Sequence, residues 1–209
     1  MRPRRLLTFP ARIQARLTRY YALDDAPGID DFVRATDGDP REALSVRQLP
    51  DGIELALHLP RRAIEQEEGG SLDGLCQVVE GVSHFLFLAE RARRELPTTQ
   101  LELELQAEVD KYVMLAIDGA EEEESRPHPS RPGRAAELRE RLFDRIHYLH
   151  PKGTERGDRY RMANDLAARF VQRLEVTFAS RGHFDQLRQA LRRFYASGQR
   201  EKIELAQAA

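Results

Sequence analysis

Apolar and polar residues alternate in the first third of the chain, and the alternation predicts a β-hairpin. Its second strand carries apolar side chains at every other position, which are Ile53, Leu55, Leu57 and Leu59. Residues two apart share one face of a strand, and Leu44 and Val46 alternate in the same way. Residues 49–52, Leu-Pro-Asp-Gly, are typical of a turn between the two. Because two strands alone are marginally stable, we expect a third strand around Phe32 and Val33 or packing on helices.

A period of three to four residues then predicts two long helices in succession. The first starts near Ser71 and ends near Glu95, before Pro97. Its apolar face consists of Leu75, Val78, Val79, Val82, Phe85, Leu86 and Ala89. The second covers residues 99–117, with Thr99 three residues before Glu102, the spacing of a capping box. We expect the two helices to form an antiparallel pair.

Within the second helix, residues 101–112 (LELELQAEVDKY) also admit interpretation as a strand, because leucines and glutamates alternate at first. The alternation ends after Leu105, whereas the helical period continues to Ala116, so a helix is the better interpretation. A helix places Glu108 inside the apolar face and Glu104 at its edge. A buried carboxylate requires a partner or has a raised pKa. We expect arginines of the C-terminal half as partners, and a functional carboxylate pair is the alternative.

The rest of the chain also has a helical pattern. Residues 118–134 (DGAEEEESRPHPSRPGR) have the composition of a flexible linker between residues 1–117 and 135–209. Further helices are expected around 138–149, from Tyr160 to about Ser180, and from Phe184 to Gly198, with a short tail beyond. The predicted fold is therefore α+β and predominantly α-helical, with a small N-terminal β-hairpin packed on a helical bundle.

Composition limits the class of protein. The chain is 41% hydrophobic and 33% charged, with one cysteine and a net charge of −2, which predicts a globular and cytoplasmic protein. We expect no transmembrane segment and no secretory signal. The basic arm, residues 1–23, has no acid and becomes helical from Ile13 to Tyr20. It either docks on the protein itself or a second copy, or contacts an anionic membrane surface.

No familiar catalytic or cofactor motif is present. The chain lacks GxGxxG, a P-loop, HExxH, CxxC and GxSxG, so no cofactor is expected and a non-enzymatic protein is favoured. The best candidate metal ligands are Glu80 and His84, one helical turn apart, joined by Glu104 and Glu108 from the next helix. The chain has no second copy of this Glu-His pair, and a solvated, salt-bridged helix face is the simpler interpretation.

The sequence also suggests an anion-binding site and a protein interface. A loop and helix start carry the cations of the best anion-binding site, which are Lys152, Arg156, Arg159 and Arg161. Residues 135–209 carry 15 basic and 10 acidic residues, whereas 1–117 carry 15 and 20. That asymmetry fits either docking of the two halves or binding of an acidic partner. On the first long helix, Phe87, Leu88 and Arg91 are a candidate protein interface.

The function that the sequence favours is protein interaction or scaffolding, with self-association through amphipathic helices. A metal-binding protein or enzyme of the helical-bundle type is the first alternative, and an anion or nucleic-acid binder using the basic C-terminal half is the second.

Overall fold

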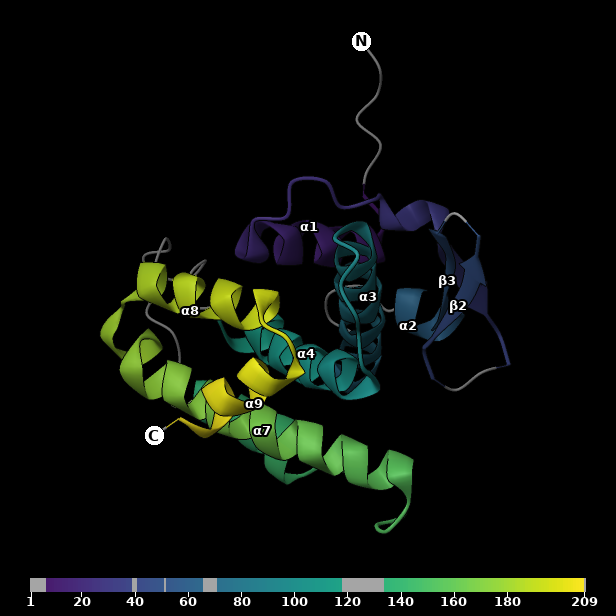
Figure 1. The fold of residues 1–209 in the computed structure, drawn as a ribbon. Coiled ribbons are helices and arrows are strands. Elements are labelled where there is room, and N and C mark those ends of the chain that lie inside the picture. Colours follow the sequence, from purple (N-terminus) through teal and green to yellow (C-terminus); the bar gives the residue numbers. More distant parts are fainter. Residues whose placement is uncertain (1–6, 39–40, 51, 66–70, 118–133, 209) are drawn as a thin grey trace. The chain divides into compact units, whose positions relative to one another are not determined.

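The computed structural model describes residues 7–38, 41–50, 52–65, 71–117 and 134–208. Contacts divide the chain into two compact units, Met1–Leu96 and Pro97–Ala209. The described residues are mostly helical, with a small sheet in the N-terminal unit, so the predicted fold class is confirmed (Figure 1). The helix predicted at 99–117 belongs to the C-terminal unit. The predicted linker lies outside the described residues, apart from Arg134.

The sheet has three strands in the order β1-β3-β2. They are β1 (Val33–Thr36), β2 (Ala43–Leu49) and β3 (Gly52–Pro60). The predicted hairpin is confirmed by the antiparallel pairing of β2 with β3, and the expected third strand, β1, runs parallel to β3. Leu55, Leu57 and Leu59 are buried on one face of β3, as their period of two predicted.

Two helices, α2 (Arg61–Glu65) and α3 (Leu72–Arg93), pack on this sheet. α1 (Phe9–Tyr21) packs on α3 and on the one-turn η1 (Ile29–Asp31). Ser71 caps α3 by accepting a hydrogen bond from the backbone N–H of Gly74. α3 packs on both α1 and β3, so the helix of the basic arm docks within its own unit (Figure 1). At Gly81 the helix approaches the sheet closely, since a Cβ there would lie 2.9 Å from Leu57 Cδ1.

Among the described helices, α3 is the one long and apolar enough by composition to span a membrane. The most apolar window of α3 has a mean hydropathy of 1.2, and 61% of that window is buried. A core helix has these same properties. There is thus no clear transmembrane segment among the described residues.

The described residues of the C-terminal unit, 97–117 and 134–208, contain no strand and form helices. They are α4 (Gln100–Tyr112), the π-helical turn η2 (Val113–Ile117), α6 (Arg134–Arg139), the π-helical turn η3 (Glu140–Asp144), α7 (Glu155–Thr177), the 3₁₀ turn η4 (Ala179–Arg181), α8 (Phe184–Ala196) and α9 (Gln199–Gln207). α4 packs on α7, and α9 packs on α4, α7 and α8. Two details of the prediction were wrong. The helical segment expected near 138–149 ends at Asp144, and the tail expected beyond Gly198 is a helix with Gly198 at its N-cap.

The helical interpretation of residues 101–112 is confirmed. Apolar residues of this helix are buried, and they include Leu105, Ala107, Val109 and Tyr112. Glu108 forms an ion pair with Lys111 of its own helix, with the Nζ atom 2.9 Å from the carboxylate, and the pairing of Glu104 and Glu108 with arginines of the C-terminal half stays a prediction. An i, i+3 pair of this kind compensates the charge locally.

A buried polar network joins α9 to α4. The side chain of Lys202 is fully buried, and its Nζ donates to Gln106 Oε1 at 2.5 Å. The Gln106 amide in turn donates to Asp110 Oδ1 at 2.9 Å, and the ammonium lies 4.2 Å from the centre of the Phe194 ring. A buried ammonium group persists only where such partners compensate its lost hydration.

A capping box stabilises the start of α4, and its contribution to the stability of the protein can be measured. Thr99 Oγ1 accepts from the N–H of Glu102 at 3.2 Å, and the Glu102 carboxylate accepts from the N–H of Thr99 at 2.8 Å. We expect Thr99→Ala to lower the free energy of unfolding by about 1 kcal/mol, the usual cost of losing an N-cap. Urea denaturation followed by circular dichroism measures this change. Thr98→Ala is the control, because the Thr98 hydroxyl has no hydrogen-bond partner among the described residues. Equal losses in both variants would contradict a capping role for Thr99.

Candidate metal centre

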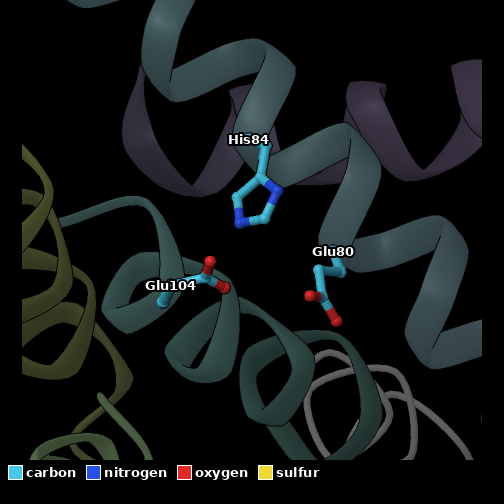
Figure 2. Close-up of side chains that lie close together, drawn as sticks. All are labelled: Glu80, His84 and Glu104. Carbon is cyan, nitrogen blue, oxygen red and sulfur yellow. The ribbon is translucent and has the colours of Figure 1, made fainter. Parts of the chain in front are cut away.

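A polar stripe runs along the N-terminal part of helix α3. Its members lie four, three and four residues apart and therefore share one face of the helix, and they are Asp73, Gln77, Glu80 and His84. Figure 2 shows Glu80 and His84 projecting from the same side of α3. Their ligand atoms lie within 4.8 Å of one another, and Glu80 is 5% exposed. The structure thus brings together the Glu-His pair that the sequence singled out.

A second carboxyl group, which the sequence analysis missed, contacts Glu80. Glu42 stands one residue before β2, and its side chain is 9% exposed and hydrogen-bonded to that of Glu80. Arg41 lies beside the pair, with its Nε 4.0 Å from Glu42 Oε2 and its Nη1 3.1 Å from Asp73 Oδ1. The guanidinium of Arg41 therefore contacts Glu42 and Asp73, and it also interacts electrostatically with Glu80.

The close approach of two carboxyl groups has an electrostatic consequence. Burial, together with the charge and hydrogen bond of Glu80, raises the pKa of Glu42 from 4.5 to about 9, although Arg41 opposes the shift. Two ionised carboxylates at hydrogen-bonding distance repel each other, and the single guanidinium of Arg41 does not outweigh this repulsion and the burial, so the pair retains one proton. A metal cation can supply the additional positive charge.

The two other predicted ligands come from α4. Glu104 projects from that helix and is buried (Figure 2). Glu108, one turn further, is paired with Lys111. The proposal that either acts as a metal ligand stays a prediction.

The predicted anion-binding loop uses several of its donors internally. The four cations named for it were Lys152, Arg156, Arg159 and Arg161. Nη1 of Arg161 donates to the carbonyl oxygens of His150 and Gly157, and Arg159 lies 3.5 Å from Glu155. Lys152 and Arg156 are exposed. Anion binding in this loop stays a prediction that would rest mainly on these two cations.

The side chains named as a protein interface are largely covered. Phe87 is fully buried and Arg91 is 7% exposed, with its guanidinium 5.6 Å from the centre of the Phe87 ring, whereas Leu88 is partly exposed. Binding of a protein partner through Phe87 and Arg91 would require these side chains to become accessible.

Comparison with known proteins identifies no relative of this chain. No protein-family model matches it, and neither a curated protein nor a solved structure is significantly similar.

Proposed function

We propose that the N-terminal unit binds one divalent transition-metal ion through Glu80 and His84, with Glu42 as the adjoining carboxyl group. The proposal rests on one observation: the carboxyl group of Glu42 is hydrogen-bonded to the buried carboxyl group of Glu80, whose ligand atoms lie within 4.8 Å of those of the His84 imidazole.

The chemistry of the three groups supports this proposal. Carboxylate and imidazole together suit Mn²⁺, Fe²⁺ or Zn²⁺, whereas Mg²⁺ and Ca²⁺ prefer oxygen ligands alone. A bound dication would displace the proton that Glu42 and Glu80 share. Glu42 would then act either as a third ligand or as the hydrogen-bonded outer group that holds Glu80 in place, since ligating carboxylates are commonly supported in this way.

Calorimetric titration of the chelator-treated full chain with Mn²⁺, Fe²⁺ under anaerobic conditions, and Zn²⁺ tests the proposal. We expect one ion per chain, and we expect Glu80→Gln and His84→Gln each to weaken binding by at least about 100-fold, since loss of an outer-shell group alone costs 10–100-fold. Glu54→Gln and His58→Gln on β3 are controls, because both lie away from the α3 stripe. Unchanged affinity in Glu80→Gln and His84→Gln would refute the site.

The same titrations measure the proton released on metal binding and test the two glutamates of α4 as ligands. Repeating them in buffers of different ionisation enthalpy measures proton release, and we expect about one proton per ion at pH 7, because metal ligands bind in their deprotonated form. Glu104→Gln and Glu108→Gln decide whether α4 contributes a ligand. Glu108→Gln is expected to leave the affinity unchanged, since Lys111 already compensates its charge.

Scaffolding by self-association, which the amphipathic helices favour, is compatible with metal binding. Native mass spectrometry of the protein from its own host measures both the oligomeric state and the bound metal. A symmetric metal-free oligomer would favour the scaffold, and a stoichiometric metal would favour the proposed site. The cytoplasmic location stays a prediction of the sequence.

A further inference from the structure

A basic side chain, that of Arg41, lies beside the carboxyl groups of the candidate metal centre. Arg41 stands two residues before β2, and its Nε lies 4.0 Å from Glu42 Oε2. It also interacts electrostatically with Glu80. Because a guanidinium keeps its positive charge at physiological pH, Arg41 already supplies part of the charge that a bound metal ion would bring.

A second ion pair holds this guanidinium in place. Nη1 of Arg41 lies 3.1 Å from Asp73 Oδ1, and Asp73 Oδ2 accepts a hydrogen bond from Gln77 Nε2 at 2.6 Å. Gln77 is buried on the same stripe of α3, so its amide orients the Asp73 carboxylate. The side chains of Arg41 and Asp73 are 43% and 66% exposed, compared with 9% for Glu42. The ion pair between Arg41 and Asp73 is therefore the solvent-accessible part of this carboxyl cluster.

We infer that Arg41 sets the affinity of the metal centre, because it is a built-in cation with which the metal ion competes for the same carboxyl groups. This inference rests on the metal-binding function proposed above. A dication bound at Glu80 and His84 would face the carboxyl groups that the guanidinium also faces, and like charges at such short range repel each other. Asp73 limits the repulsion, since it holds the guanidinium at the exposed edge of the cluster. Loss of the Arg41 charge should therefore strengthen metal binding, and loss of the Asp73 charge should weaken it.

Calorimetric titration of the chelator-treated full chain with Mn²⁺ tests the inference. We expect Arg41→Gln to bind Mn²⁺ at least about tenfold more tightly than the natural sequence, because it removes a positive charge a few ångströms from the carboxyl groups. Arg41→Lys keeps the charge and should retain the natural affinity to within about threefold. Asp73→Asn should bind Mn²⁺ more weakly than the natural sequence. The gain in Arg41→Gln should also shrink as the salt concentration rises, because salt screens a partly exposed charge.

Arg47→Gln is the matched control, since Arg47 lies on β2 and pairs with the exposed Glu54 of β3. A purely structural role for Arg41 predicts the opposite result, because a disrupted site loses affinity. If the natural sequence binds Mn²⁺ and Arg41→Gln binds it equally or more weakly, the inference is overturned while the metal centre stands. Absence of binding in the natural sequence, Arg41→Gln and Glu80→Gln alike would refute the metal centre, and the inference with it.

Discussion

Replacing Glu42 with glutamine is expected to stabilise the metal-free protein at pH 8 and, at the same time, to weaken its binding of metal. A glutamine keeps the shape of the side chain and donates a hydrogen bond to the Glu80 carboxylate without adding a second negative charge. We expect a gain on the order of 2 kcal/mol in the free energy of unfolding at pH 8, the usual magnitude for relief of a poorly compensated buried polar group.

The sign of the pH dependence follows from the raised pKa. The pKa of Glu42 is 4.5 in the unfolded chain and about 9 in the folded protein, so the folded state binds more protons between these values. The stability that this group contributes is therefore fully present below pH 4.5 and is lost as the pH rises toward 9. In Glu42→Gln that loss disappears, and the two proteins should differ little near pH 4.5.

Melting temperatures in the presence of a chelator, measured from pH 4.5 to pH 9, test this expectation. Glu54→Gln is the control, because Glu54 is an exposed residue paired across the strands with Arg47. If Glu42→Gln loses stability with pH as steeply as the natural sequence, Glu42 is not the titrating group. Metal affinity should fall by at least about tenfold in the same variant, the cost of losing an outer-shell group.

Alanine at position 157 is expected to destabilise the C-terminal unit strongly. A Cβ on Gly157 would lie 1.9 Å from the carbonyl oxygen of Pro151 and 2.8 Å from Thr154 Oγ1. The first of these atoms belongs to the backbone and cannot rotate away. The backbone must therefore shift, and the Thr154 cap of α7, which accepts from the N–H of Gly157 at 3.1 Å, is disrupted. We expect the free energy of unfolding to fall by about 3 kcal/mol, which is at the upper end of the usual cost of overpacking.

Urea denaturation of Gly157→Ala and Gly28→Ala measures this effect. Gly28 has a φ of −64°, and its Cβ would meet nothing within 4 Å, so alanine there should change stability by less than about 0.5 kcal/mol. Similar stabilities for the two variants would show that the chain does not approach itself this closely between Pro151 and Gly157.

The elements of this protein were determined largely by local sequence. The alternation of residues 53–59 identified β3, and the helical period identified α3, α4, α7 and α8. Ser71 and Thr99 marked the starts of two helices, because a cap acts on backbone groups only two or three residues away. The same local information placed Glu80 and His84 on one face of α3.

Only the tertiary structure determined which side chains far apart in the sequence contact one another. No periodic pattern in the sequence relates Glu42 to Glu80, which lies 38 positions later in the chain. The pairing arises because β2 and α3 pack within one unit. Lys202 was likewise expected in a tail, yet it is buried against Gln106 of α4. Periodicity and capping report interactions over a few residues, whereas the partner of a buried charge depends on how whole elements pack, and that packing brings together residues far apart in sequence.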